Sequence, residues 1–425
     1  NFCIIVDYTI CSMKNNFLLE MQSRGYLNQC TDLDELTNIC NNQAITAYIG
    51  FDCTASSLHV GSLLQIMVLK LMQKNGHRPI VLLGGGTTLI GDPSGKSSTR
   101  KILEKNEIKR NIKSIKKVFN KILDTSNKKT KPIFVDNYDW LAKLNYIDFL
   151  RNVGIHFTIN KMLSFDSVKI RLEREQSLSY MEFNYMILQA YDFYQLFKVN
   201  KCILQIGGSD QWGNIINGVE LIRRMLKKDS FGLTTPLITL ASGTKMGKTE
   251  KGAVWLDKDL FSSYDYWQFW RNTDDRDVEK FLNFFTDIKT EKITQLIKEE
   301  KNINKLKELL ANEATKILHG ELASRKAEKT AKETFKSGGY GTNLPEIQIK
   351  ENDLKVGIKI LDLLSFNKIM SSKSEARRAI KSNALKINNE ILTDENKIIQ
   401  LNDFSNIKIM KISFGKKKHY LIKII

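Results

Sequence analysis

Paired cysteines and histidine clusters are missing from this 425-residue chain. Its six cysteines are scattered, with no CxxC pair and no histidine at zinc-ligand spacing. The sequence thus excludes a structural zinc site and a disulfide framework and predicts no protein-bound metal. It favours a reducing compartment, which we take to be the cytoplasm.

A membrane-spanning run is missing too. No apolar stretch approaches the ~20 residues needed to cross a bilayer, and the short run Phe2–Val6 has no basic region before it. We therefore expect the protein to be neither secreted nor membrane-bound. Met13 begins a stretch that reads like a natural start, so we expect residues 1–12 to be an extension outside the fold.

The sequence lacks two common nucleotide-binding motifs. A Walker A loop needs four residues between its first glycine and the Gly-Lys pair, but only three separate Gly91 from Gly95 and Lys96. The GxGxxG pattern is absent as well. The glycine-rich stretch Gly84–Ser97 follows a predicted strand, so it is either a ligand loop or a turn at a sheet edge.

The net charge is strongly positive. A formal charge of +18 and a pI near 9.4 favour a polyanionic partner such as a nucleic acid. An Asn-, Ile- and Lys-rich composition that reflects codon usage explains the same excess. Composition alone leaves both explanations open.

The first part of the chain alternates between strand-like and helical segments, which predicts an α/β fold with a doubly wound, Rossmann-type parallel sheet. The predicted strands are 44–51, 79–83, 132–135, 202–206 and 233–240, and the predicted helices are 58–73, 111–123, 181–197 and 212–227. From 264 to 336 the spacing is helical throughout. Turn formers at 337–345 then mark a linker before a small α+β domain.

These patterns predict four parts after the extension. They are an α/β domain over 13–250, a helical domain over 251–336, a linker over 337–352 and a small basic domain over 353–425.

Polar groups gather where predicted strands end and helices begin. His59 and Gly61 fall at a helix N-terminus, where free N–H groups favour phosphate, although such a histidine is often only a cap or a core residue. Tyr185, Gln189 and Asp192 share one helical face, as a ligand site or as a structural hydrogen-bond network.

Two further segments complete the pattern. Gln205–Asn214 lies at the carboxyl end of a buried strand, where such folds bind ligands, and Lys245–Thr249 places two lysines and a hydroxyl on a glycine-containing loop. The lysine loop alone carries little weight, because a chain this basic contains many such pentads.

Together, in this order and spacing, these segments resemble the bacterial-type tyrosyl-tRNA synthetases, which are class I aminoacyl-tRNA synthetases, over essentially the whole chain from Met13. His59–Ser62 matches the first class I signature (HIGH in the family), and Lys245–Thr249 matches the second (KMSKS). Ser62 replaces the second histidine of the first signature, and it can still hydrogen-bond a ribose. Cys53 stands where a proline is often found.

The resemblance implies an ATP-dependent tyrosine–tRNA ligase. Tyrosine and ATP would form tyrosyl-adenylate and pyrophosphate, and the tyrosyl group would pass to the 3′-terminal adenosine of tRNA(Tyr). ATP would arrive with Mg²⁺, without an organic cofactor or zinc. Family members are homodimers, so we expect a dimer contact near Asp139–Met162.

The resemblance also assigns roles residue by residue. Tyrosine would be held by Tyr48, Asp92, Tyr185, Gln189, Asp192 and Gln211, with Tyr48 and Asp192 at its phenol. ATP would be held by Asp52, His59, Gly61, Ser62, Gly208, Asp210 and Lys248. The catalytic groups would be Thr54, His59, Lys96, Arg100, Lys245, Lys248 and Thr249. Asn137 and Trp140 match family positions around the pocket, with less defined roles.

The C-terminal part resembles a small RNA-binding module that is commonly appended to these synthetases. Residues 351–425 hold 15 Lys and Arg against 8 Asp and Glu. Phosphate contacts would come from Arg377, Arg378, Lys381 and Lys386, unless these only form a solvated helix face. A second basic stretch, Lys101–Lys131, is either a contact for the tRNA acceptor arm or another solvated helix.

Two other functions remain compatible with the sequence. A tryptophanyl-tRNA synthetase shares the class and fold but usually lacks the C-terminal module and is not expected to carry the Tyr48 and Asp192 pair. A synthetase-derived RNA-binding protein without aminoacylation activity is the second, although it would have no use for lysines around ATP.

Overall fold

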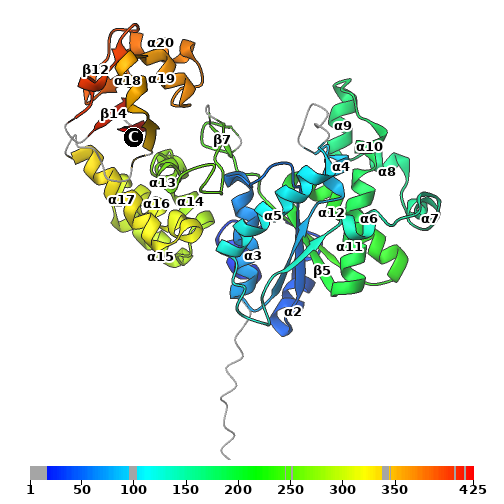
Figure 1. Cartoon of the computed structure of the whole chain (residues 1–425). Coiled ribbons are helices and arrows are strands. Elements are labelled where there is room, and N and C mark those ends of the chain that lie inside the picture. The colour runs from blue at the N-terminus through cyan, green and yellow to red at the C-terminus, as the bar shows by residue number, and fades with distance from the viewer. Residues whose placement is uncertain are drawn as a thin grey trace, which may run out of the picture. The chain divides into compact units, whose positions relative to one another are not determined.

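The computed structural model describes residues 17–94, 103–244, 246–249, 252–336, 344, 346–405, 408–415 and 418–425. The chain divides into two compact units, and each is described by itself. The first unit comprises residues 1–247 and 279–294, and the second comprises 248–278 and 295–425. Figure 1 shows the elements of both units.

The first unit is built on a six-stranded sheet with the strand order β1-β6-β5-β2-β3-β4. Its strands are β1 (Gln29–Cys30), β2 (Thr46–Phe51), β3 (Arg78–Leu83), β4 (Ile133–Asp136), β5 (Cys202–Gly208) and β6 (Phe231–Thr235). All neighbours pair in parallel except β1 and β6. The predicted doubly wound parallel sheet is confirmed, and the antiparallel edge strand β1 was not foreseen.

Helices lie on both faces of this sheet, α3 (Leu63–Lys74) and α5 (Lys105–Ile122) on one and α11 (Tyr185–Asn200) and α12 (Trp212–Leu226) on the other (Figure 1). Apolar side chains of α11 and α12 pack on β2 and β3 in a single core cluster. The remaining helices of the unit include α1 (Phe17–Ser23), α2 (Leu33–Asn42), α4 (Thr87–Ile90), α6 (Tyr138–Leu141), α7 (Tyr146–Asn152), α8 (Ile159–Leu163), α9 (Asp166–Glu173) and α10 (Tyr180–Phe183).

Four predicted elements differ from the structure. The predicted helix 111–123 begins six residues earlier, as α5 (Lys105–Ile122). The predicted strand 233–240 ends at Thr235, because Pro236 has no N–H for a further ladder bond. The predicted helix 181–197 is split at Asn184 into α10 and α11. The predicted helix 58–73 begins as a 3₁₀ turn, Val60–Ser62, before α3.

A distant segment completes the first unit. Arg24, which is 5% exposed, donates hydrogen bonds to the carbonyls of Asn283 (2.9 Å), Thr286 (3.0 Å) and Ile288 (2.9 Å). These carbonyls lie at and after the end of α14 (Val278–Phe285). A cation at a helix C-terminus satisfies carbonyls that have no partner within the helix. Residues around 283–288 therefore belong structurally with the N-terminus.

The second unit contains a helical part and a small C-terminal domain. The helices are α13 (Ser263–Arg271), α16 (Ile303–His319) and α17 (Glu321–Lys336), while α15 (Thr290–Glu299) runs across the unit boundary. The C-terminal domain has a five-stranded sheet, β12-β11-β14-β15-β9, with α18 (Glu351–Val356), α19 (Ile360–Phe366) and α20 (Lys373–Lys381). The five strands are Glu390–Ile391, Leu385–Ile387, Ile409–Phe414, Lys418–Ile424 and Glu346–Ile349 in that order.

One boundary of this domain differs from the expected linker. Strand β9 and the start of α18 lie inside the 337–352 segment, and β9 pairs in parallel with β15 over Glu346–Ile349. Ile349 is 7% exposed and belongs to the apolar core of the domain. A linker that contributes a strand and a core side chain is part of the domain from residue 346 onward.

Candidate functional site

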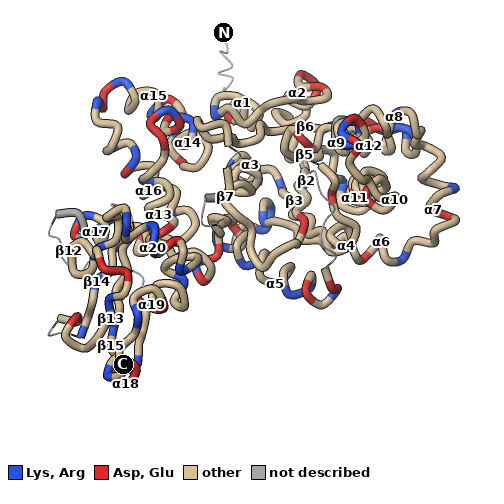
Figure 2. Tube along the Cα trace, turned by 90° about the horizontal axis from the view of Figure 1, so that it is seen from above, with Lys and Arg blue, Asp and Glu red and all other residues tan. Residues whose placement is uncertain are grey.

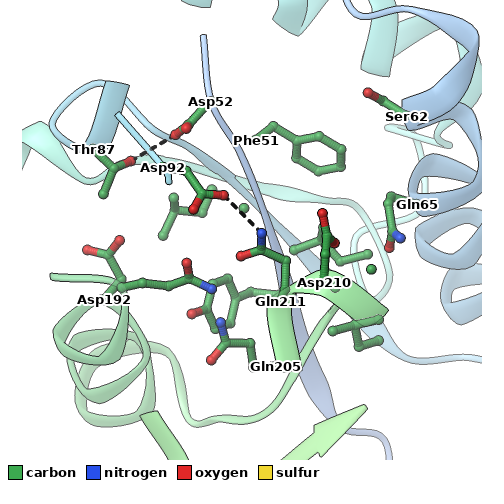
Figure 3. A pocket seen from close by; sticks show the side chains of 18 of the residues that line it. Phe51, Asp52, Ser62, Gln65, Thr87, Asp92, Asp192, Gln205, Asp210 and Gln211 are labelled. Atoms are coloured by element: carbon green, nitrogen blue, oxygen red, sulfur yellow. Dashed lines mark hydrogen bonds between the residues drawn. The ribbon is translucent and has the colours of Figure 1, made fainter. Parts of the chain in front are cut away.

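A cavity of about 320 Å³ opens at the carboxyl ends of β2 and β5 in the first unit (Figure 3). β2 and β5 are neighbours in the sheet. The chain leaves β2 toward β3 on one side and leaves β5 toward β6 on the other side, so the cavity lies where the strand order reverses. Many of the predicted site residues line it: Tyr48, Asp52, Gly61, Ser62, Asp92, Tyr185, Gln189, Asp192, Gly208, Asp210 and Gln211.

The deep end of the cavity holds Tyr48 and Asp192. Asp192 is 2% exposed, and its carboxylate accepts hydrogen bonds from Asn137 Nδ2 (2.8 Å) and Trp140 Nε1 (2.7 Å). Burial raises the pKa of Asp192 to about 7, although the two donors act in the opposite direction. The hydroxyl of Tyr48 is buried and has no hydrogen-bond partner among the described residues. A buried, unpaired hydroxyl beside a carboxylate suits a ligand that carries a hydroxyl of its own.

A chain of hydrogen bonds connects this end with the cavity mouth. Asn137 Nδ2 also donates to Thr87 Oγ1 (3.0 Å), and that hydroxyl donates to Asp52 Oδ1 (3.2 Å). Tyr185 donates its phenol hydrogen to the same carboxylate at 3.3 Å. Figure 3 shows the contact between Thr87 and Asp52 as a dashed line. Asn137 and Trp140 thus act as direct supports of Asp192, which defines the roles that the sequence left open.

The glycines of Gly84–Gly86 permit a close approach. A Cβ at Gly84 would lie 2.7 Å from Asp52 Oδ1, and one at Gly85 would lie 2.1 Å from Asp136 Oδ1. The amide of Gly86 donates to Asn137 Oδ1 at 2.7 Å. These glycines let the loop lie close to Asp52 and Asp136, and two other residues of the same segment, Thr87 and Asp92, line the cavity.

The opposite wall carries a second polar group. Gln211 Nε2 donates to Asp92 Oδ2 (2.9 Å), as Figure 3 shows, and Ser94 N donates to Asp92 Oδ1 (2.9 Å). Asn214 Nδ2 donates to the amide oxygens of Gln189 (3.1 Å) and Gln211 (3.1 Å). One asparagine on α12 thereby fixes side chains from α11 and from the loop after β5.

The two class I signatures meet at His59. Its Nδ1 accepts a hydrogen bond from Gly61 N at 3.0 Å, so His59 caps the turn, which is the alternative role that the sequence left open. A Cβ at Gly61 would lie 2.8 Å from the carbonyl oxygen of Met246, and one at Gly247 would lie 2.7 Å from His59 Nδ1. Gly247 has φ +120°, which side chains rarely adopt. Both glycines let the signatures pack directly against each other.

Some predicted residues are not placed in the cavity. Thr54 is exposed and does not line it, and His59 lies at its edge without lining it. Lys96, Arg100 and Lys245 lie outside the described residues. The backbone of Lys248 and Thr249 forms β7, and their side chains are also outside the described part of the chain.

The cavity is also lined by Gln65, which the sequence analysis does not name, and by Gln205, which it includes in a site segment without a role. Gln65 lies on α3 and donates to Thr235 Oγ1 at 2.7 Å, while Gln205 interrupts the apolar strand β5 and is 2% exposed. A glutamine inside an otherwise apolar strand costs free energy unless it meets a polar partner, and that signal was available in the sequence.

Neither a metal cluster nor a membrane span is found among the described residues. They contain no group of three or more His, Cys, Asp or Glu side chains arranged to hold a metal ion. Within the same residues, no helix is long and apolar enough to cross a bilayer.

Comparisons with known proteins agree with this geometry. The family described as "tRNA synthetases class I (W and Y)" matches residues 40–336, and the "Tyrosine--tRNA ligase SYY-like C-terminal domain" matches 337–422. The tyrosine–tRNA ligase of Pelagibacter ubique is 62% identical over 411 residues, covering 97% of this chain and 100% of that protein. The chain belongs to the bacterial-type tyrosyl-tRNA synthetases. It is therefore a class I aminoacyl-tRNA ligase.

Other relatives of this family support the assignment. The tyrosine–tRNA ligase of Xanthobacter autotrophicus is 51% identical, covering 98% of this chain and 99% of that protein. A C-terminally truncated mitochondrial tyrosyl-tRNA synthetase from Aspergillus nidulans superposes with a TM-score of 0.68 at 29% identity, covering 75% of this chain and 94% of the other. A tryptophanyl-tRNA synthetase from Encephalitozoon cuniculi, at 16% identity and a TM-score of 0.53, shares the fold.

Proposed function

We propose that the cavity binds L-tyrosine with its phenol between Tyr48 and Asp192, and ATP across the carboxyl ends of β2 and β5. The buried pair at the deep end carries this proposal. Tyr48 has an unpaired hydroxyl and Asp192 is a carboxylate held by two donors, so an amino acid with a phenol satisfies both groups. Phenylalanine would leave them unpaired, which costs binding free energy.

The proposed reaction has two steps. A carboxylate oxygen of tyrosine attacks the α-phosphorus of ATP, the bond to the bridging oxygen breaks, and pyrophosphate leaves. A ribose hydroxyl of the terminal adenosine of tRNA(Tyr) then attacks the carbonyl carbon of the adenylate, and AMP leaves. The protein contributes by orienting the reactants and stabilising the charge that develops on the phosphates.

The proposed residues divide between the two substrates. Asp92, Tyr185 and Gln189 hold the ammonium of tyrosine, Gln211 orients its carboxylate, and Asp52 lies near the α-phosphate of ATP. ATP meets Gly61, Ser62, Gly208 and Asp210, which line the mouth of the cavity. His59, Lys96, Arg100, Lys245, Lys248, Thr249 and Thr54 remain the proposed groups for phosphate transfer. Mg²⁺ enters as part of the substrate, coordinated mainly by phosphate oxygens.

The decisive test is amino-acid-dependent ATP–pyrophosphate exchange. Tyrosine, phenylalanine and tryptophan are compared in parallel with the full chain. We expect exchange with tyrosine alone, because the deep end of the cavity is built for a phenol. Exchange with tryptophan would favour the tryptophanyl alternative, and folded protein without exchange would favour an RNA-binding protein that does not aminoacylate.

We further propose that the protein is a homodimer through the insertion between β4 and α11. Large apolar side chains are exposed there, including Tyr146 (59%), Ile147 (67%), Ile155 (73%) and Ile159 (59%). Such a cluster on a soluble enzyme marks a protein contact. It falls within the predicted region, Asp139–Met162.

The dimer proposal predicts the effect of a single charge. Ile155→Glu should shift the protein from dimer to monomer, because an ionised side chain in an apolar interface is costly to desolvate. Sedimentation velocity measures the change. Leu322→Glu on α17 is the control, since Leu322 is 77% exposed in the other unit. A monomeric wild type would reject the proposal, as would an Ile155→Glu variant that stays dimeric.

A further inference from the structure

The C-terminal domain exposes one large aromatic side chain that its fold does not need. Phe366 ends α19 and is 77% exposed, whereas the neighbouring Leu363 and Leu364 are buried in the apolar core. Leaving a phenylalanine in water forgoes the stabilisation that burial would give it. The side chain is therefore better suited to a partner than to the core.

Basic side chains continue from this ring along α20. Lys373 Nζ lies 5.7 Å from the centre of the Phe366 ring, and Lys373 also forms an ion pair with Asp362. Arg377 and Lys381 follow Lys373 at steps of four residues, so the three cations share one helical face. All three are exposed, and Figure 2 shows the Lys and Arg residues of α20 in blue.

The neighbouring residues leave the positive charge on this face of α20 exposed. Glu375, the acidic residue of α20, accepts hydrogen bonds from Ser371 N (2.7 Å) and Ser371 Oγ (2.6 Å), so it points back over the helix start. Ala376 and Ile380 form the buried side of the helix. Lys368 adds a further exposed cation just after α19. The result is a single aromatic ring at one end of a strip of positive charge.

We propose that Phe366, Lys373, Arg377 and Lys381 form a binding site for an unpaired nucleotide of the tRNA, whose base stacks on Phe366 while the flanking phosphates meet the cations. A stacking ring beside a row of cations is the arrangement that recognises unpaired nucleic acid. A protein partner would call for a broader apolar patch. The inference rests on the proposed function, because it takes the RNA to be tRNA(Tyr).

The experiment measures the dissociation constant of a tRNA(Tyr) transcript at several salt concentrations. Phe366→Ala should weaken binding about 10-fold, the scale of one lost base stack. The slope of log Kd against log salt should stay unchanged, because no charge is removed. Arg377→Ala should instead lower that slope by about one. Phe366→Trp should bind like the wild type, whereas Phe366→Leu should bind like the alanine variant.

Matched variants separate stacking from general effects. Val356→Ala, at an 86% exposed residue of the same domain, should leave binding unchanged. Leucine keeps an apolar surface but has no aromatic face, so wild-type affinity in Phe366→Leu would overturn the stacking site. An altered sedimentation coefficient in Phe366→Ala with unaltered tRNA binding would also overturn it, in favour of a protein contact.

Failure of this inference is distinguishable from failure of the proposed function. The residues proposed to bind tyrosine and ATP all precede residue 250 and lie outside the C-terminal domain, so ATP–pyrophosphate exchange with tyrosine should be unchanged in every Phe366 variant. If the wild type shows tyrosine-dependent exchange and Phe366→Ala binds tRNA(Tyr) as tightly as the wild type, only the stacking site is rejected. A wild type without exchange rejects the proposed function itself.

Discussion

Replacing Asp192 with alanine will lower kcat/KM for tyrosine in ATP–pyrophosphate exchange by about 100-fold. The variant removes a buried acceptor and leaves Asn137 and Trp140 with unpaired donors, which lie 2.8 and 2.7 Å from the carboxylate. Losing a charged hydrogen-bond partner in a buried site costs about 3 kcal/mol. Steady-state kinetics with tyrosine varied at saturating ATP measures the loss.

Phenylalanine supplies the control for this variant. It carries no hydroxyl for Asp192 to accept, so its activation should change far less than that of tyrosine, and the preference for tyrosine should shrink. A variant that activates tyrosine like the wild type would contradict the assignment of Asp192 to the phenol. Equal losses for both amino acids would indicate a general distortion of the pocket.

The pH dependence gives a further check on Asp192. Its pKa of about 7 means that the free enzyme loses the carboxylate as the pH falls below neutrality, so kcat/KM for tyrosine should fall there. Asp192→Asn should remove this inflection. Because the pKa of Asp192 is raised above its ordinary value of 3.8, the protonated side chain favours the folded state. Its contribution to the free energy of unfolding is fully present below pH 3.8 and is lost as the pH rises through 7. Thermal unfolding of both proteins across that range measures the difference.

Gly247→Ala should lower kcat for adenylate formation about 100-fold while leaving tyrosine affinity unchanged. The φ of +120° disfavours any side chain, and the added Cβ would lie 2.7 Å from His59 Nδ1. The second signature would have to move away from the first, and displacements of about 1 Å in an active site cost rate on this scale. In the proposed site, tyrosine affinity is set elsewhere, by Tyr48 and Asp192. Pre-steady-state kinetics separates the two quantities.

Gly243 offers a matched control for Gly247. It also has a positive φ, +81°, but an added Cβ would meet no atom within 4 Å. Gly243→Ala therefore introduces backbone strain without the contact with His59. If it slowed adenylate formation as much as Gly247→Ala, loop strain rather than the packing of the signatures would explain the effect.

The sequence predicted the catalytic fold because its signals are local. Apolar runs such as 79–83 and 202–206 are bounded by turn formers, and each became a strand within two residues of its expected limits. β1 was missed because it has only two residues, Gln29 and Cys30, and depends on pairing with β6. The break at Asn184 was missed because the apolar spacing continues across it; a capping box at Ser179 and Glu182 starts a separate short helix.

For the site, the sequence predicted which side chains line the cavity better than it predicted the hydrogen bonds between them. Tyr185, Gln189 and Asp192 line the cavity as their helical spacing indicated. The roles of Thr87 and Asn214 depend on contacts between segments 50 and 25 residues apart, which no local pattern reveals. Gln65 was missed because its contact with Thr235, 170 residues away in the sequence, leaves no local pattern.

The contacts of Arg24 have a consequence for synthesis on the ribosome. Arg24 and the carbonyl of Asn283 are 259 residues apart, so at 5–20 residues per second about 13–50 s separate their emergence. During that interval the guanidinium has Glu20 but none of its three distant carbonyl partners. The N-terminal segment therefore cannot form these hydrogen bonds until most of the protein has been synthesised. A fragment that stops near residue 250 would keep this segment in its immature state, open to chaperones and proteases.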